Sequence, residues 1–257
     1  MRISIITISF NSEKTIERTI KSVLAQTWKN YEYIIVDGAS KDSTINIIKS
    51  YEPQFEGRLK WKSEPDTGIY NAMNKGIKRA SGDIIGIVNS DDWLEQDALE
   101  RVSKYYNEHN QDNNALYCGG INYHKTDGRV IEYKVKLNSF KWQARLFYVM
   151  YGIRHPATFV PRNVYERIGL FNEEMHLSAD QDFILRCYFG GVKLINLGCV
   201  LSNMSEGGLS TEGTDRARRI SEEDRRLMLK AFGKKGLVSV WLWLSWKWRY
   251  RLKRLIC

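Results

Sequence analysis

"GDIIGIVNSDDWL", residues 82–94, places an apolar run directly before two adjacent carboxylates, Asp91 and Asp92. The β-branched run Ile84–Val88 predicts a strand that is buried in a core. Neighbouring carboxylates repel each other, and a core offers little water to weaken that repulsion, so the pair needs a hydrogen-bonding or cationic partner. This stretch therefore predicts a core strand that ends at a functional edge.

Runs of the same kind occur three more times in the first half of the chain. They are Ile3–Ser9, Tyr31–Val36 and Leu59–Lys62. Segments in which apolar residues have helical spacing lie between these runs. The first predicted helix follows a cap signal at Asn11 and Ser12, and the second starts near Ser40–Ser43. Alternating strands and helices predict a mainly parallel sheet with right-handed crossovers.

Residues 110–210 predict the second half of the same domain, with mixed strand directions. Strands are expected over Ala115–Tyr123, over Arg129–Val135 and around Phe159, and a helix over Ala179–Tyr188. A chain of 257 residues can hold one large domain of this kind with a short appendage. The expected fold class is α/β, with a mixed, mainly parallel sheet flanked by helices.

Polar side chains stand at all four strand ends of the first half. They are Ser9 and Asn11, Asp37, Asp66, and Asn89 to Asp92. Ligands of open parallel sheets bind at the carboxyl ends of the strands, so these residues predict one site. The alternative is that each is an ordinary turn or cap former.

The pair Asp91 and Asp92 suits a hard divalent cation. Magnesium takes one or two protein carboxylates and completes its shell with water and phosphate oxygens. No histidine pair at metal-ligand spacing accompanies the pair, which excludes a zinc or copper site of ordinary composition. The alternative interpretation is that both aspartates cap a helix that opens at Trp93–Leu94.

Four segments in this order resemble the inverting family 2 glycosyltransferases. The segments are "ISIITISFNSEKTIERTIKSVLAQT", "YEYIIVDGASKDST", "SEPDTGIYNAMNKGIKRASGDIIGIVNSDDWL" and "SADQDFILR". The resemblance covers residues 1 to about 210 and points to the subgroup that builds bacterial exopolysaccharide, lipopolysaccharide or capsule. It implies a Rossmann-like GT-A domain over residues 1–212, with a nucleotide-binding half (1–110) and an acceptor-binding half (111–212).

The resemblance also implies roles for the residues at the sheet edge. Ser9, Asn11 and Asp37 would hold the nucleoside, and Asp66 would frame the nucleotide pocket. Asp92 would bind Mg²⁺ or Mn²⁺, with Asp91 towards the ribose or the water shell of the metal. The general base of the inverting transfer would be Asp180 in "SADQDFILR".

Other features around these motifs allow two interpretations each. Asp182 lies about 200° from Asp180 around a helix, so it is expected to pair with Arg186 at the helix surface. His155, before a proline, is interpreted as structural rather than as part of the acceptor site. Gly207 and Gly208 are either an ordinary turn or part of a loop that closes over the donor.

The net charge of +9 is confined to the C-terminal tail, residues 213–257. Residues 215–257 carry 13 Lys and Arg against 4 Asp and Glu, and the rest of the chain is balanced. The final segment, "LVSVWLWLSWKWRYRLKRLIC", is too short in apolar residues to span a bilayer, but its Trp and Lys/Arg spacing suits an amphipathic helix on an anionic membrane. Packing against protein is the alternative.

These features predict a metal-dependent inverting glycosyltransferase that uses a nucleotide-sugar donor, a UDP-sugar for preference, and a saccharide acceptor that is linked to a lipid. Four widely spaced cysteines fit reduced thiols, so we expect a cytoplasmic protein, peripheral on the inner face of the cytoplasmic membrane. Nucleic-acid binding is not expected, because no binding module surrounds the basic tail. A catalytically silent scaffold on the same fold remains the alternative.

Overall fold

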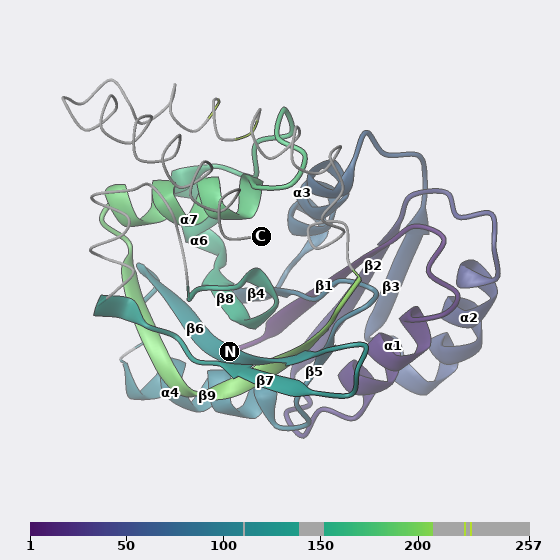
Figure 1. Cartoon of the computed structure of the whole chain (residues 1–257), viewed down its shortest axis with the longest axis horizontal. Helices are drawn as coiled ribbons and strands as arrows, with labels where there is room; N and C mark the ends of the chain where they lie inside the picture. Colours follow the sequence, from purple (N-terminus) through teal and green to yellow (C-terminus); the bar gives the residue numbers. More distant parts are fainter. Residues whose placement is uncertain (110, 139–151, 208–223, 225–226, 228–257) are drawn as a thin grey trace, which may run out of the picture.

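The computed structural model describes residues 1–109, 111–138 and 152–207, together with Asp224 and Leu227 (Figure 1). Within these residues the strands form one mixed sheet in the order β3-β2-β1-β4-β8-β6-β9-β5, with β7 paired to β6. The strands are β1 (Ile3–Ser9), β2 (Tyr31–Asp37), β3 (Leu59–Ser63), β4 (Ile84–Ile87), β5 (Trp93–Leu94), β6 (Ala115–His124), β7 (Val130–Tyr133), β8 (Thr158–Pro161) and β9 (Lys193–Ser205).

The helices cover both faces of this sheet. They are α1 (Ile16–Leu24), α2 (Thr44–Tyr51), α3 (Ile69–Arg79), α4 (Ala98–Glu108), α6 (Arg162–Ile168) and α7 (Ala179–Phe189), with short 3-10 turns η1 (Glu52–Phe55) and η2 (His155–Ala157). The core on one face joins α3, α6 and α7, and the core on the other joins α1, α2 and α4, as Figure 1 shows. This arrangement confirms the predicted α/β class.

Strand β1 contributes to both cores. Its residues Ile6 and Ile8 belong to the core under α3, whereas Ile3 and Ile5 belong to the core under α1. Side chains of a strand alternate between faces, so a strand with helices on both sides buries residues on both of them. This is why isoleucines occupy both faces of β1, with Ser4 and Thr7 buried among them.

The parallel half of the sheet brings polar strand ends together. β3, β2, β1 and β4 run parallel, and the register pairs Ser9 with Asp37 and Asp37 with Ser63. The carboxyl ends of these strands are therefore level at one edge. In the other half β8 is antiparallel to both β4 and β6, which confirms the expected mixed directions.

The segment after the acidic pair differs from the helix-cap alternative. Trp93 and Leu94 form strand β5, which pairs with Asn203 and Ser202 of β9, and α4 begins only at Ala98. Asp91 and Asp92 thus cap no helix, because the backbone that follows them is bonded into the sheet. Strand β7 is also shorter than the expected Arg129–Val135.

Candidate active site at the carboxyl edge of the sheet

The loop Asn89–Asp92 follows β4 and is held by side chains of the neighbouring α1 region. The Ser12 and Ser90 hydroxyls lie 2.8 Å apart, and the Thr19 hydroxyl donates to the carbonyl of Asp92 at 2.6 Å. Thr19 and Asp92 are both buried. These bonds fix the loop to the rigid part of the fold before any ligand binds.

Arg18 places a positive charge near the acidic pair. Its guanidinium donates to the carbonyl of Asp91 at 2.7 Å and to the hydroxyl of Ser205 at 2.8 Å. The guanidinium also stacks on Trp93, with its central carbon 3.6 Å from the ring centroid. One arginine therefore joins α1, the acidic loop and the end of β9.

Asp92 lies in an environment that disfavours its own negative charge. The residue is 2% exposed, and burial, followed by the charge of Asp91, raises the pKa of Asp92 to about 7. The Asn89 amide donates to its Oδ2 at 3.3 Å, while Oδ1 of Asn89 is buried without a hydrogen-bond partner in the described part of the chain. A buried carboxylate whose negative charge is disfavoured in this way would be stabilised by a bound cation.

The residues present fit a hard cation such as Mg²⁺ or Mn²⁺. Asp92 and Asp91 supply carboxylate oxygens at the open edge of the sheet, and these are the ligands that such ions prefer. Among the described residues there is no cluster of three or more His, Cys, Asp or Glu side chains that could enclose a metal. The arrangement therefore suits an ion that takes most of its ligands from water and substrate.

The predicted nucleoside residues Ser9 and Asp37 are bonded to each other. The buried carboxylate of Asp37 accepts hydrogen bonds from the hydroxyls of Ser9 (3.0 Å), Ser40 (2.5 Å) and Ser63 (2.7 Å), and from the Ser40 amide at 2.9 Å. Four bonds use the acceptor positions of a carboxylate. In this conformation Asp37 braces three strand ends, and a base contact requires the Ser40 hydroxyl to turn away.

Asp66 and Phe10 flank Gly38 just beyond Asp37. A methyl group on Gly38 would lie 2.6 Å from Oδ2 of Asp66 and 3.3 Å from the Phe10 ring, so a larger residue would require the Asp66 carboxylate to move. The Asp66 carboxylate itself accepts from the Gly68 amide at 2.9 Å. Asn11 shares the edge with a φ of 47° and accepts from the Lys41 amide at 2.9 Å.

Phe10 is a residue that the sequence analysis did not single out. Its ring is 62% exposed, although it lies beside Gly38 and Asp66 at the rim of the predicted nucleotide pocket. An exposed aromatic ring at the edge of a polar pocket offers a surface on which a planar base can stack. The signal available in the sequence was an aromatic residue that interrupts the polar end of the first strand.

Asp180 lies in the first turn of α7 and faces two other elements. The hydroxyl of Tyr70, in α3, donates to its Oδ1 at 3.3 Å, and Nδ1 of His155 lies 3.5 Å from its Oδ2. Burial, followed by the charge of Asp180, raises the pKa of Tyr70 well above its usual value, so Tyr70 is a permanent donor. Asp180 is partly exposed and can reach a substrate.

His155 connects this carboxylate to the acidic loop. Its Nε2 lies 3.1 Å from the amide nitrogen of Asn89, which also bonds Asp92. A structural role alone was expected for His155, and that expectation missed this contact. The structure thus places the predicted base 3.5 Å from a histidine that is hydrogen-bonded, through Asn89, to the predicted metal residue Asp92.

The pairing predicted for Asp182 and Arg186 is confirmed, but it is not at the surface. Nε of Arg186 donates to Oδ2 of Asp182 at 2.8 Å, and Asp182 is only 3% exposed. The guanidinium also donates to the carbonyls of Ile168 and Leu170. The pair therefore anchors the loop before α7 to the helix, and Asp182 does not face the site.

Asp224, from the segment assigned to the tail, lies beneath the start of α7. Its carboxylate is 1% exposed and accepts from the backbone amides of His176 (2.9 Å), Leu177 (2.7 Å) and Ser178 (2.8 Å). Leu227 packs against the core that contains α7. These two residues of the predicted tail thus contact the turn that leads into α7 and the core that contains this helix.

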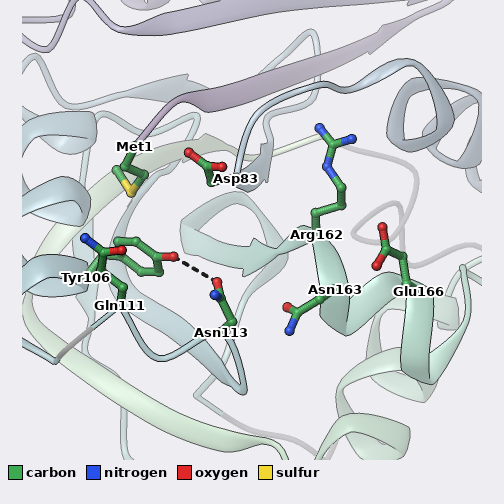
Figure 2. Close-up of a pocket in the computed structure, with 8 residues that line it drawn as sticks. All are labelled: Met1, Asp83, Tyr106, Gln111, Asn113, Arg162, Asn163 and Glu166. Atoms are coloured by element: carbon green, nitrogen blue, oxygen red, sulfur yellow. Dashed lines mark hydrogen bonds between the residues drawn. The ribbon is translucent and has the colours of Figure 1, made fainter.

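A separate pocket of about 370 Å³ lies at the opposite end of β4 (Figure 2). Asp83, which precedes β4, accepts from the Arg2 amide at 2.7 Å, Arg162 donates to the Gly82 carbonyl, and Tyr106 donates to Asn113 at 2.8 Å. These charged groups connect the residues that precede β1 and β4 with Arg162, which follows β8. The pocket is distinct from the acidic edge, which follows β4.

The glycosyl transferase family 2 model matches residues 4–169, more than half of the chain. This chain belongs to glycosyltransferase family 2. The PGL/p-HBAD biosynthesis glycosyltransferase of Mycobacterium bovis (strain BCG) is 30% identical over 221 residues, which are 83% of this chain and 80% of that protein. Asp180 lies beyond the residues that the family model matches, although within the length that the relatives share.

Two solved structures have the same fold as this family 2 glycosyltransferase. Residues 1–349 of S. aureus TarS in complex with UDP-GlcNAc align with a TM-score of 0.67 and 22% identity, over 89% of this chain and 67% of that one. The chain spans 44% of the longer TarS structure. The mannosyltransferase PcManGT of Pyrobaculum calidifontis, in complex with GDP-Man and Mn²⁺, aligns with a TM-score of 0.66 and 17% identity over 91% of this chain and 64% of that one.

Family membership and the GT-A-like fold make the chain a nucleotide-sugar-dependent glycosyltransferase. The relatives do not support one class of surface polysaccharide, since the mycobacterial protein is named for PGL/p-HBAD biosynthesis. No helix among the described residues is long and apolar enough to cross a membrane. Gly208 and the final aromatic and basic segment lie outside the described residues, and Gly207 has a φ of 108°.

Proposed function

We propose that this family 2 glycosyltransferase moves a sugar, with inversion, from a UDP-sugar to a saccharide acceptor that is linked to a lipid. The observation that carries the proposal is the continuous network from Asp92 through Asn89 and His155 to Asp180 at the carboxyl edge of the sheet. Sugar transfer needs a site for the donor diphosphate and a general base, separated by no more than the length of one sugar. This network supports both at one edge.

In the proposed reaction the acceptor hydroxyl oxygen attacks the anomeric carbon while the bond from that carbon to the diphosphate oxygen breaks. The hydroxyl proton passes to the Asp180 carboxylate, and the nucleoside diphosphate leaves with the bonding electrons. Asp92, with Asp91, would hold Mg²⁺ or Mn²⁺, which neutralises charge on the leaving diphosphate when bound. Ser9, Asn11, Asp37, Asp66 and Phe10 would form the nucleoside pocket.

Different observations support the proposed donor and the proposed acceptor. TarS binds UDP-GlcNAc and PcManGT binds GDP-Man, so the fold accepts either base, and the choice of UDP follows the family resemblance. A lipid-linked acceptor fits the basic, aromatic C-terminal segment, because an enzyme docked on an anionic membrane shares a surface with such an acceptor. In this proposal the protein is bacterial, cytoplasmic and peripheral on the inner face of the membrane.

The test is donor hydrolysis by the purified chain across UDP-, GDP- and dTDP-sugars, with Mn²⁺ and with chelator. We expect metal-dependent release of UDP, abolished by Asp92→Ala and lowered about 10²- to 10⁴-fold by Asp180→Asn. The control Asp112→Asn, at the far end of the sheet where its partner is Lys193, is expected to retain full activity. Absence of release from every donor, together with no metal-dependent nucleotide binding, would favour the silent scaffold.

A further inference from the structure

His155 lies between the acidic loop after β4 and the first turn of α7. Its Nε2 is 3.1 Å from Nδ2 of Asn89, and its Nδ1 is 3.5 Å from Oδ2 of Asp180. The imidazole is 20% exposed and the Asp180 side chain 23%. The ring is thus largely enclosed, with one nitrogen directed at each of two elements that come from opposite halves of the chain.

The neighbours of Asn89 determine which ring nitrogen of His155 carries hydrogen. The two amide hydrogens of Asn89 have two acceptors, Oδ2 of Asp92 at 3.3 Å and Nε2 of His155. The same amide nitrogen, Nδ2 of Asn89, faces both of these acceptors. Because an amide nitrogen only donates, Nε2 must accept, and the hydrogen of the neutral ring is on Nδ1.

The Nδ1 hydrogen of His155 is directed at Asp180, whose other oxygen already accepts from Tyr70. Tyr70 approaches from α3 and His155 from η2, so two donors on separate elements address the two oxygens of one carboxylate. The 3.5 Å separation is long for a formed bond, and catalytic hydrogen bonds often shorten only when substrate binds. Two donors of this kind restrict the rotation of the carboxylate.

We propose that His155 is a positioning residue that holds the Asp180 carboxylate through Nδ1–H, with its own tautomer set by Asn89 and, through Asn89, by Asp92. The proposal rests on the proposed function, in which Asp180 is the base. It adds that the metal-binding acid and the base are aligned by one chain of polar contacts through Asn89 and His155. A carboxylate that can rotate accepts the proton less often in the reactive geometry, so loss of His155 lowers the rate of transfer and leaves donor binding intact.

The chemistry of His155 permits a test that separates positioning from packing. In Asn the amide nitrogen is as many bonds from Cα as Nδ1, and in Gln it is as many bonds away as Nε2. His155→Asn therefore keeps the donor to Asp180, whereas His155→Gln keeps only the group that faces Asn89. A purely structural histidine would show no such preference between the two amides.

The first experiment measures kcat and KM of the full chain for sugar transfer or donor hydrolysis with Mn²⁺. We expect kcat to fall at least about tenfold in His155→Ala and His155→Gln, and to stay within about threefold of wild type in His155→Asn, with the KM for donor unchanged in all three. His109→Ala, at the exposed end of α4, is the matched control and is expected to behave as wild type. Equal rates in the Ala, Gln and Asn variants would overturn the proposal.

A second experiment does not depend on activity. Long-range proton–nitrogen NMR of the imidazole-labelled chain, which has four histidines, is expected to show the His155 signal as a neutral Nδ1–H tautomer, identified by its loss in His155→Ala. A neutral Nε2–H tautomer would overturn the proposal. Full activity in Asp180→Asn would overturn the assignment of the base itself, whereas an inactive Asp180→Asn with normal kcat in His155→Ala would overturn only the role of His155.

Discussion

At the scale of single residues, the proposed nucleoside pocket contains a carboxylate with four hydrogen bonds and an exposed aromatic ring. The Asp37 carboxylate accepts four hydrogen bonds from the protein, whereas the Phe10 side chain, near it across Gly38, is 62% exposed. A large apolar side chain that is exposed in the free protein lowers solubility, and it adds little to the free energy of unfolding because it buries little surface. We therefore expect the ring to contribute to binding rather than to folding.

Phe10→Ala is expected to weaken UDP binding by about 1–3 kcal/mol, which is the usual contribution of a base stacked on an aromatic side chain. Isothermal titration with UDP and Mn²⁺ measures the change, and Phe10→Tyr is expected to restore most of it. Phe189→Ala, which removes another exposed ring (47%) at the end of α7, is the control. Equal UDP affinity in wild type and Phe10→Ala would show that the ring does not touch the base.

At the scale of the elements, a buried carboxylate near the start of β2 ties the parallel strands together. Glu32 has a fully buried side chain and accepts from Ser4 of β1 at 2.7 Å, from the Ser81 hydroxyl at 2.7 Å and from Lys60 of β3 at 3.1 Å. Burial by itself would raise the pKa of Glu32. The hydrogen bonds, those from Ser4 and Ser81 first, outweigh burial and lower the pKa to about 2.

The stabilisation from Glu32 is expected to depend on pH. Because its folded pKa of about 2 lies below the ordinary value of 4.5, its contribution is complete above pH 4.5 and is lost as the pH falls towards 2. Glu32→Gln should lower the free energy of unfolding near neutral pH by on the order of 2 kcal/mol, and the difference from wild type should shrink in acid. Urea unfolding across this range measures it.

The exposed Glu17 of α1, which pairs with Lys21, provides the matched control for Glu32. Glu17→Gln makes the same chemical change on a solvated helix face, where ion pairs contribute little, and a much smaller effect is expected. A difference between wild type and Glu32→Gln that stays constant from neutral pH into acid would contradict the account of Glu32.

At the scale of the whole molecule, two residues of the predicted tail, Asp224 and Leu227, pack with the domain. Asp224 accepts three backbone amides just before α7, so residues far apart in the sequence share one turn of structure. The expected boundary near residue 212 divides the basic tail from the domain by composition only. Asp224 and Leu227 lie against the half of the molecule that carries the proposed base.

Asp224→Ala is expected to lower the free energy of unfolding by about 2–3 kcal/mol, because it leaves three buried amides without their acceptor. It should also lower kcat, since the loop that leads into α7 would lose its anchor. Urea unfolding and donor hydrolysis measure the two effects on one preparation. The control is Asp112→Ala, which removes an aspartate that pairs with Lys193 at the other end of the sheet. Equal stability of wild type and Asp224→Ala would contradict this expectation.

The sequence by itself determined the alternating strands and helices of the parallel half, the polar residues at the strand ends and the family. Those features depend on periodicity and on motifs that are contiguous in the chain, such as the run into Asp91 and Asp92. It could not show that Arg18 and Asn89 are the partners of that pair. It also missed Phe10 and Asp224, because exposure and long-range hydrogen bonds leave no local pattern.

Only the tertiary structure decided how the two halves of the site meet. His155 and Asp180 are brought to Asn89 because β8 runs antiparallel beside β4 and places η2 at the carboxyl edge. Likewise, Trp93 and Leu94 form a strand rather than a helix because β9 offers them backbone partners. Local patterns fix which residues can do chemistry, whereas the pairing of distant strands fixes which of them stand together, since that pairing depends on contacts across the whole chain.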